Sequence, residues 1–253
     1  MRTLYLIAFL FLSSPVFAGN QFLIVTDIHY GADNKPTADN DTGPALLASM
    51  LGKFKKLSQQ ADFILNLGDL PTHMLLSSPK KGDYERALFH ALYKADVGHK
   101  PMFYIPGNND SLAGNYQAFS MNGTTPLSYA AEWTGACVFC KGLMIDDSNM
   151  NAKGYYSSYV MPDNKDIILI ALNSAPFVSL PLFVSSYPNQ DKDAKAEFLW
   201  LERQLKTHTA KQLLIAMHVP PGMNYKGRPF WYRQYLKQFT ALLDQYKPAY
   251  QEI

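Results

Sequence analysis

Cysteine and charge are both scarce in this chain. Only two of its 253 residues are cysteine, which excludes a small scaffold held together by several disulfides. Charged residues make up 17% of the chain, and 23 Lys and Arg against 21 Asp and Glu give a formal net charge of +2. This even balance gives no support for a nucleic-acid-binding surface, which requires a concentrated basic stripe.

Apolar residues, in contrast, are plentiful. Hydrophobic residues make up 47% of the chain and aromatic residues 13%, which excludes a disordered protein that is poor in aromatics and rich in charge. A chain of 253 residues is long enough to bury a sizeable core. The length therefore favours one α/β domain, with two small domains as the alternative.

The first 18 residues are typical of a secretory signal peptide. Arg2 supplies a positive charge, and residues 4–12 form an apolar run that is short for a bilayer span. Val16 and Ala18 are the small residues that a cleavage site requires. We expect an exported protein, periplasmic or extracellular, with a domain at 19–253 and no transmembrane segment after cleavage. An uncleaved anchor or a buried N-terminal helix is the alternative.

The two cysteines form a C-x-x-C pattern at Cys137 and Cys140. Two cysteines alone cannot complete a structural zinc site, which takes four ligands. In an oxidising compartment, the pattern favours a local Cys137–Cys140 disulfide over a redox role.

Short apolar runs alternate with amphipathic segments along most of the chain. This alternation of strands and helices predicts an α/β architecture with a covered sheet. Residues 113–165 are rich in Gly, Asn, Ser and Tyr and are harder to interpret; within them we predict only an exposed strand, at residues 155–161. The other predicted strands are residues 22–26, 63–67, 102–105, 167–172 and 213–217, of which 22–26 and 167–172 are expected to be buried. The predicted helices are a segment opening at 42–44 and residues 83–94, 193–206 and 230–246.

No charged residue lies between Asp166 and Asp191. Asn173, Pro176 and Pro181 interrupt the stretch, so it is not a membrane span. It is either a strand followed by an apolar loop packed on the domain, or a strand followed by a lid at residues 176–184 that contacts a greasy substrate.

Metal-ligand residue types follow four of the apolar runs. In an open α/β sheet, ligands bind outside the carboxyl ends of the strands, so the fold would gather these side chains at one edge. Carboxylate, imidazole and amide oxygen are donors for divalent first-row metals. Singly, each residue has an ordinary explanation as a turn, a surface pair or a core histidine, but the ordered set predicts a metal site. Its members are Asp27, His29, Asp69, Asn108 and His218.

The ordered set resembles the calcineurin-like metallophosphoesterase superfamily, whose pattern is D-x-H, G-D, G-N-H-[DE], H and G-H-x-H. Within that superfamily the chain looks most like the branch that contains acid sphingomyelinase and the endopolyphosphatases. The matching segments are 68–73 (GDLPTH), 172–174 (LNS), 198–201 (FLWL) and 218–222 (HVPPG). The resemblance implies an α/β/β/α sandwich of two sheets that holds two divalent ions, such as Zn, Mn or Fe.

The resemblance also implies roles for individual residues. Asp27 and His29 would bind the first metal, Asp69 would bridge both, and Asn108 and His218 would bind the second. A hydroxide activated by the two metals would attack phosphorus in line, with the ions about 3.5–4 Å apart.

Two departures from the superfamily pattern matter. Asn109 stands where most members have histidine, and an amide can hydrogen-bond a phosphate oxygen but cannot act as a general acid near neutral pH. His73 is then the candidate general acid, with an ordinary loop histidine as the alternative. No G-H-x-H follows His218, so each metal would lack a histidine, through truncation of the chain or degeneration of the site.

Two classes of function therefore remain. The first is a secreted, two-metal phosphodiesterase that resembles the sphingomyelinases, with polyphosphate or a nucleotide as the rival to a phospholipid substrate. Asn109 favours phosphate-rich substrates, whereas the apolar segment at 176–184 favours lipid. The second class is an inactive binding or accessory protein with a degenerate metal site.

Overall fold

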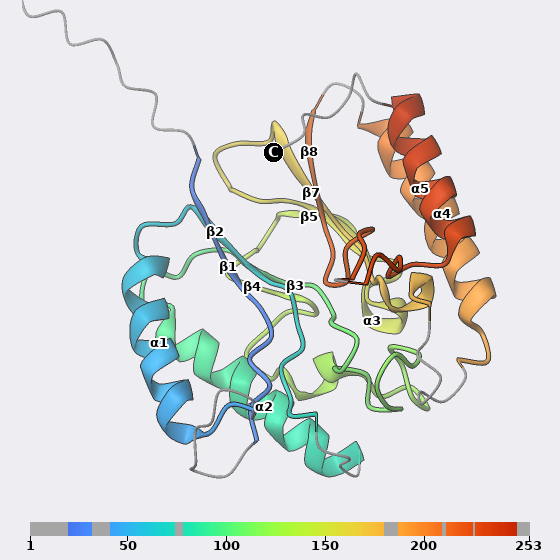
Figure 1. Cartoon of the computed structure of the whole chain (residues 1–253). Helices are drawn as coiled ribbons and strands as arrows, with labels where there is room; N and C mark the ends of the chain where they lie inside the picture. Colours follow the sequence, from blue (N-terminus) through green and yellow to red (C-terminus); the bar gives the residue numbers. More distant parts are fainter. Residues whose placement is uncertain are drawn as a thin grey trace, which may run out of the picture.

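A computed structural model describes residues 20–31, 41–73, 78–179, 187–208, 211–224 and 226–246. Its strands form two four-stranded sheets (Figure 1). The first sheet, in the order β1-β2-β3-β4, contains β1 (Phe22–Val25), β2 (Phe63–Asn66), β3 (Met102–Tyr104) and β4 (Cys137–Val138). The second sheet, in the order β5-β6-β7-β8, contains β5 (Met144–Asp146), β6 (Tyr156–Tyr159), β7 (Ile167–Ala171) and β8 (Gln212–Ala216).

Helices cover the outer face of each sheet. In Figure 1, α1 and α2 lie outside the first sheet and α4 and α5 lie outside the second. The predicted α/β/β/α sandwich is therefore confirmed. The helices are α1 (Pro44–Ser58), α2 (Ser78–Ala95), α3 (Met150–Lys153), α4 (Gln190–Thr207) and α5 (Arg233–Tyr246), with 3-10 turns η1 (Pro126–Tyr129) and η2 (Ala175–Phe177).

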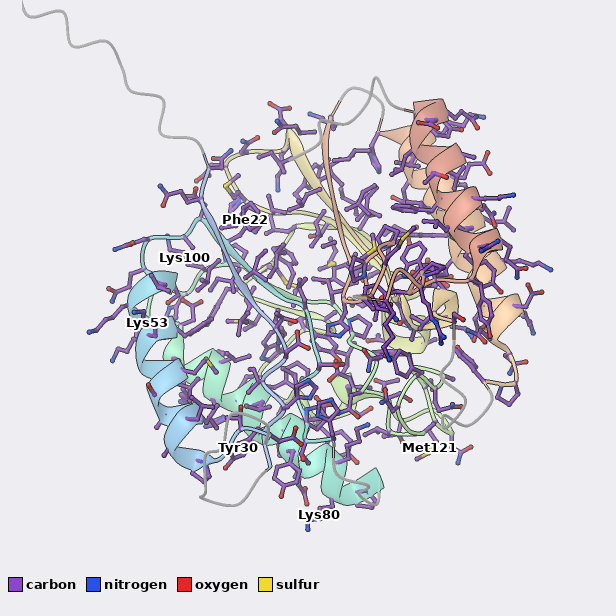
Figure 2. All side chains as sticks on the ribbon, viewed as in Figure 1. Phe22, Tyr30, Lys53, Lys80, Lys100 and Met121 are labelled. Atoms are coloured by element: carbon purple, nitrogen blue, oxygen red, sulfur yellow. A yellow bond between two sulfur atoms is a disulfide. The ribbon has the colours of Figure 1, made fainter. Side chains whose placement is uncertain are left out.

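The core consists of two clusters separated by the second sheet, and side chains fill the space between the layers (Figure 2). Strand β7 contributes to both clusters, because successive side chains of a strand point to opposite faces. Leu169 and Ala171 belong to the cluster shared with the first sheet, whereas Ile168 and Ile170 belong to the cluster under α4 and α5. Burial on both faces explains why β7 is a continuous apolar run in the sequence.

The prediction of an exposed strand at residues 155–161 is wrong. Strand β6 is buried because it lies between β5 and β7 inside the second sheet. Its polar groups are paired: the Tyr156 hydroxyl donates to the carbonyl of Tyr104 at 3.0 Å, and Ser157 Oγ donates to Gln204 Oε1 at 2.8 Å. The prediction overlooked such pairing, which lets polar side chains lie in a core. The short strands β4 and β5 of this region were also not predicted.

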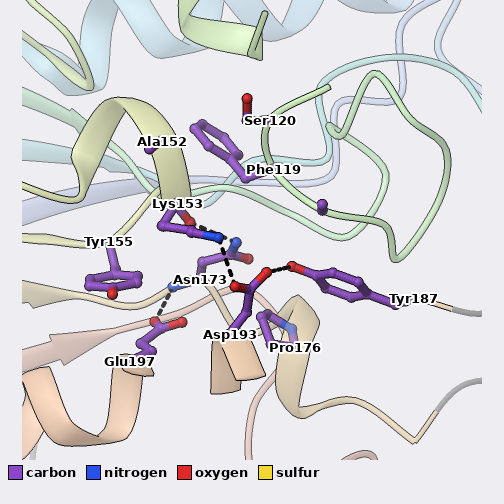
Figure 3. A pocket seen from close by; sticks show the side chains of 11 residues that line it. Phe119, Ser120, Ala152, Lys153, Tyr155, Asn173, Pro176, Tyr187, Asp193 and Glu197 are labelled. Atoms are coloured by element: carbon purple, nitrogen blue, oxygen red, sulfur yellow. Dashed lines mark hydrogen bonds and ion pairs between the residues drawn. The ribbon is translucent and has the colours of Figure 1, made fainter. Parts of the chain in front are cut away.

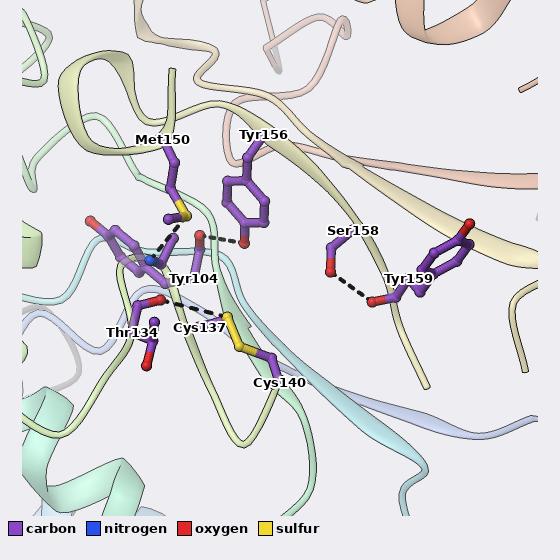
Figure 4. Close-up of a disulfide and its surroundings, with 9 residues drawn as sticks. Tyr104, Thr134, Cys137, Cys140, Met150, Tyr156, Ser158 and Tyr159 are labelled. Atoms are coloured by element: carbon purple, nitrogen blue, oxygen red, sulfur yellow. Dashed lines mark hydrogen bonds between the residues drawn. A yellow bond between two sulfur atoms is a disulfide. The ribbon is translucent and has the colours of Figure 1, made fainter. Parts of the chain in front are cut away.

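Cys137 and Cys140 form the predicted disulfide (Figure 4). The bond closes the short segment that leaves β4, beside Tyr104 and Met150. Phe177 and Val178 of the expected lid belong to the second core and Pro176 is buried, whereas residues 180–186 lie outside the described residues. The predicted signal peptide also lies outside them. None of the helices in the described part of the chain combines the length and the hydropathy that a membrane crossing requires.

Candidate metal centre

The predicted ligands follow the carboxyl ends of four strands. Strands β1, β2 and β3 are parallel neighbours, so the loops that carry Asp27, Asp69 and Asn108 leave the first sheet at one edge. His218 follows β8 of the second sheet and reaches the same place, because its ring Nδ1 lies 2.8 Å from the carbonyl of Leu67. The sandwich therefore brings ligand loops from both sheets together.

Asp69 lies at the middle of the site and is 3% exposed. Its Oδ2 atom is 3.3 Å from Nε2 of His218 and 3.7 Å from Nε2 of His29. The same His29 nitrogen is 3.5 Å from Oδ1 of Asp27. The structure thus brings four of the five predicted ligands within one small cluster, with Asp69 between the two histidines.

Both histidines are oriented by the backbone. The Nδ1 atom of His29 lies 3.2 Å from the carbonyl of Pro71, just as Nδ1 of His218 lies next to that of Leu67. A proton on Nδ1 donated to a carbonyl leaves Nε2 as the ligand atom, which is how histidines are usually held in metal sites. The Nε2 atoms are also the ones that face the carboxylates.

Asn108, the fifth predicted ligand, is fixed by its own neighbours. Its Nδ2 donates to Oδ1 of Asn115 at 2.8 Å, and its carbonyl accepts from the amide of Tyr116 at 2.7 Å. The side-chain amide nitrogen is therefore occupied, which leaves the amide oxygen as the donor atom that a divalent cation could use.

Three of the ligands have backbone conformations that L-residues rarely adopt. Asp27, His29 and Asp69 have φ values of 54°, 46° and 53°. Such conformations cost free energy, and they persist at functional sites where the surroundings enforce them. The strained positions therefore support a function for these three residues beyond packing.

The G-D and G-N-N-D loops approach each other so closely that both glycines are required. A Cβ atom on Gly68 would lie 2.2 Å from the amide nitrogen of Gly107, and one on Gly107 would lie 2.1 Å from Oδ1 of Asp69. The same close approach lets the amide of Asn109 donate to Asp69 Oδ1 at 2.7 Å. Asp69 thus has one oxygen held by the next loop and the other facing the histidines.

The Asp110 side chain connects the G-D loop to the G-N-N-D loop through hydrogen bonds. Its Oδ2 accepts hydrogen bonds from the amides of Asp69 and Gly107 and from the Tyr104 hydroxyl, at 3.0, 2.7 and 2.8 Å. Its Oδ1 accepts from the amide of Leu70 at 2.8 Å. Four donors on one buried carboxylate fix the loops relative to each other. Asp110 stands at the [DE] position of the G-N-H-[DE] pattern, and the sequence did not predict this supporting role.

The electrostatics of the cluster follow from the paired carboxylates and imidazoles. The hydrogen bond from His29 lowers the pKa of Asp27 to about 2. Burial alone lowers the pKa of His218, but the hydrogen bond and the charge of Asp69 outweigh it and raise this pKa to about 9. Burial also lowers the pKa of His29, but Asp27 and Asp69 outweigh this effect and raise it. The carboxylates thus favour protonated imidazoles, and binding of a divalent ion would displace such protons.

His73 lies at the exposed rim of the cluster. Its ring stacks on that of His29, with 3.8 Å between the ring centroids. Asp41 holds it, because Oδ1 of Asp41 lies 2.7 Å from the His73 Nδ1 atom and Oδ2 accepts from the His73 amide at 2.6 Å. No sequence motif pointed to Asp41, since an isolated acid in a polar loop is usually a surface residue.

Asn109 is less available than the sequence suggested. Its Nδ2 atom donates to the carbonyls of Pro71 and Thr72, at 2.8 and 3.1 Å, and the residue is buried. In this arrangement the side chain supports the loop that carries His73, and it would have to turn to donate to a phosphate.

The chemistry of the donor set fits divalent metal ions. Carboxylate oxygens of Asp27 and Asp69 and a nitrogen of His29 lie within 4.8 Å of one another. A second group on the rim, formed by His29, Asp41 and His73, satisfies the same limit. All three members of the first group have strained backbone, and the buried carboxylate of Asp110 supports the loop of Asp69. In the second group only His29 has strained backbone, so the first group is the better candidate.

A separate polar pocket lies between α3, η2 and the start of α4 (Figure 3). Lys153 pairs with Asp193 at 2.7 Å, and the Tyr187 hydroxyl donates to the other oxygen of Asp193 at 2.5 Å. Glu197 accepts from the amide of Asn173 at 2.7 Å. None of the predicted metal ligands lines this pocket, and its polar groups largely satisfy one another.

Comparisons with known proteins agree with this geometry. A family model described as calcineurin-like phosphoesterase matches residues 21–250. A protein named sphingomyelinase phosphodiesterase D, from Dictyostelium discoideum, is 25% identical over 213 residues, which cover 82% of this chain and 44% of that protein. The chain thus spans less than half the length of this curated relative.

Two solved structures share the fold. A dimetal phosphatase from Danio rerio aligns with a TM-score of 0.53 and 11% identity, over 90% of this chain and 78% of the other. GAP50, described as the anchor in the inner membrane complex of Plasmodium, aligns with a TM-score of 0.52 and 15% identity, over 90% and 63%. At these identities the likeness extends to the fold alone.

Proposed function

Because the chain belongs to the calcineurin-like phosphoesterase family, we propose that it is a metal-dependent hydrolase of phosphoric diesters. The observation that carries the proposal is the position of Asp69, whose carboxylate lies between His29 and His218. A carboxylate in that position can bridge two cations. Divalent ions bound there would supply a nucleophilic hydroxide at neutral pH and neutralise charge on the phosphate oxygens.

The chain's own residues would bind and orient these ions. Asp27 and His29 offer an oxygen and a nitrogen after β1, and Asn108 and His218 offer the same pair of atom types after β3 and β8. The carbonyls of Pro71 and Leu67 would hold the two rings with Nε2 facing inward. We take the ions to be Zn, Mn or Fe, since imidazole suits these metals better than Mg or Ca.

His73 is our candidate for protonating the leaving group. Its ring is half-exposed beside His29, and the Asp41 carboxylate fixes its Nδ1 side. The opposite nitrogen, Nε2, would then be the one to face a bound ester. Asn109 would act indirectly, by holding the loop that carries His73.

The substrate class that we favour is a phospholipid. The similarity to a sphingomyelinase phosphodiesterase supports this choice, as does the uncharged stretch that includes Pro176. Polyphosphate or a nucleotide is the alternative, supported by Asn109 in place of a histidine. The leader-like residues 1–18 support export of the protein, to the periplasm or the outside of the cell.

Turnover of bis-p-nitrophenyl phosphate after reconstitution with Mn²⁺ or Zn²⁺ tests the reaction. We expect activity that requires metal and is lost in Asp69→Ala. Activity that survives Asp69→Ala would belong to a contaminant or to another site, and the proposal would be wrong.

Leaving groups of different acidity test His73. We expect His73→Ala to slow diesters of poor leaving groups more than p-nitrophenyl diesters, because good leaving groups need little protonation. Asp41→Asn should have the same selective effect, to a smaller extent. Equal losses on both kinds of substrate would remove the general-acid role.

An inactive binding or accessory protein is the second candidate. GAP50, which carries a related fold in a protein described as an anchor, favours it. Metal analysis separates the two candidates. Less than one equivalent of metal after reconstitution would favour the binding protein.

A further inference from the structure

A lysine is buried beneath the candidate metal centre. Lys81 lies in the first turns of α2 and is 7% exposed, whereas Lys80, its neighbour in the sequence, is exposed. Burying an ammonium group is unfavourable unless hydrogen bonds and opposite charge compensate it. A lysine in this position therefore needs an explanation that packing does not give.

Lys81 makes one specific contact, and that contact is with a ligand loop. Its Nζ atom donates to the carbonyl of Ser111 at 2.8 Å. Ser111 directly follows Asp110, the carboxylate that ties the G-D loop to the G-N-N-D loop. The ammonium group thus anchors the far end of the segment that presents Asn108 and positions Asp69.

Charged groups of α2 and of the same loops surround Lys81. Among the described residues Lys81 forms no direct ion pair, and it lies in the field of Glu85 first, and then of Asp110 and Asp69. Glu85, one turn further along α2, is fully buried, and neither of its carboxylate oxygens has a hydrogen-bond partner in the described part of the chain. Burial, with Asp110 adding to it, raises the pKa of Glu85 well above its ordinary value, which favours its neutral form. The two ligand loops contribute the Asp110 and Asp69 carboxyl groups to these surroundings.

We propose that Lys81 is a positioning residue of the metal centre, which holds the Asn108–Ser111 segment in the geometry that binds the cations. The proposal rests on the proposed metal site. The positive charge of Lys81 by itself disfavours a nearby cation, so removal of this charge alone would tighten metal binding. We infer that the loss of the anchor outweighs this effect, and that Lys81 variants bind metal more weakly.

The test compares Lys81→Met with Lys80→Met, which removes the same charge from the exposed neighbouring position. Each protein is stripped with a chelator, and the affinity for Zn²⁺ alone is measured by competition with a chromophoric chelator. We expect Lys81→Met to bind Zn²⁺ at least about tenfold more weakly than wild type, in the range typical of residues that support metal ligands. Lys80→Met should match wild type.

The melting temperature of the metal-free proteins distinguishes positioning from a general structural role. Lys81→Met breaks no direct ion pair among the described residues and removes one hydrogen bond, to the carbonyl of Ser111. We therefore expect the melting temperature of the metal-free protein to fall by no more than about 5 °C. Lys81→Gln, which removes the charge but keeps a donor on a shorter side chain, replaces Lys81→Met should the latter not fold. Failure of both to fold, while Lys80→Met folds, would assign Lys81 to fold stability and overturn the proposal.

The outcomes separate this inference from the proposed function. Wild-type protein that binds no Zn²⁺ would overturn both. Wild-type protein that binds Zn²⁺ with unchanged or tighter binding by Lys81→Met would overturn the positioning role alone.

Discussion

The two sheets contribute to the candidate centre in different ways. The first sheet supplies Asp27, His29, Asp69 and Asn108 from three adjacent parallel strands, and the loops are fixed to each other by Asp110. The second sheet supplies His218 alone, which reaches the first sheet through contacts with Leu67 and Asp69. The first half of the site is thus a rigid local assembly, whereas the second half depends on how the sheets pack together.

Asp69 is the residue on which both halves depend, so its substitution should have the largest effect. We expect Asp69→Asn to lower hydrolysis of bis-p-nitrophenyl phosphate by more than about 100-fold, because one carboxylate oxygen would serve both ions. Metal content after reconstitution should fall in parallel. Asp163→Asn, at an exposed position, is the control and should change neither quantity.

Asp110→Asn should destabilise the loops of the first sheet without removing a predicted metal ligand. An asparagine offers one acceptor oxygen and an NH₂ group where four donors now meet a carboxylate, so donors would face donors. We expect a loss of about 2–4 kcal/mol in the free energy of unfolding of the metal-free protein, measured with urea. Asp147→Asn, at an exposed position, should lose little, and an equally small loss in Asp110→Asn would contradict the role given to Asp110.

His218→Ala should separate the two halves of the site. If the first sheet's ligands form a local assembly, the variant keeps one equivalent of metal where wild type holds two. Metal analysis after reconstitution and removal of excess ion measures this number. His208→Ala, at the end of α4, is the matched control. Loss of both equivalents would mean that the first half does not hold a cation on its own.

The smallest expected effect is on the free energy of unfolding, and it concerns Glu197 of α4, away from the candidate metal centre. Burial raises the pKa of Glu197 well above its ordinary value. The folded protein therefore binds this proton more tightly than the unfolded chain, and stability is lost as pH rises above about 4.3 towards the folded pKa. Glu197→Gln should remove that loss while its Oε1 atom still accepts from Asn173.

Urea unfolding at pH 4 and pH 7 measures the Glu197 effect. We expect Glu197→Gln to gain stability relative to wild type at pH 7 and to gain less at pH 4. Glu202→Gln, further along α4, should show no such difference. A gain that does not depend on pH would contradict the assignment of a neutral, buried Glu197.

Much of the fold could be predicted because strands and helices differ in the period of their apolar residues. The predicted segments 22–26, 63–67, 102–105, 167–172 and 213–217 each contain an observed strand, and all four predicted helices occur. The strand at 155–161 was found, but its burial was missed, because Tyr and Ser look solvent-facing until their partners in other elements are known. Strands β4 and β5 are too short to show any periodicity.

The candidate site divides in a similar way. Residue type and position after a strand identified the five predicted ligands, although their role still awaits the experiments above. Asp41, Asp110 and Lys81 were not predicted to support the site, because the partners that reveal this role lie far along the chain. These partners are His73, the G-D loop and Ser111. Asn109 was expected to face a phosphate, and only the structure places its amide on the carbonyls of Pro71 and Thr72.

The sequence by itself determined the alternation of strands and helices, and the acid, imidazole and amide side chains at the strand ends. These features are local, since each depends on residues a few positions apart. Only the tertiary structure decided that His218 meets Asp69, because sheet order and packing bring its ring to the carbonyl of Leu67, 151 residues away. The burial of Lys81 is also decided by the tertiary structure, because a helix face is buried only where another element packs against it.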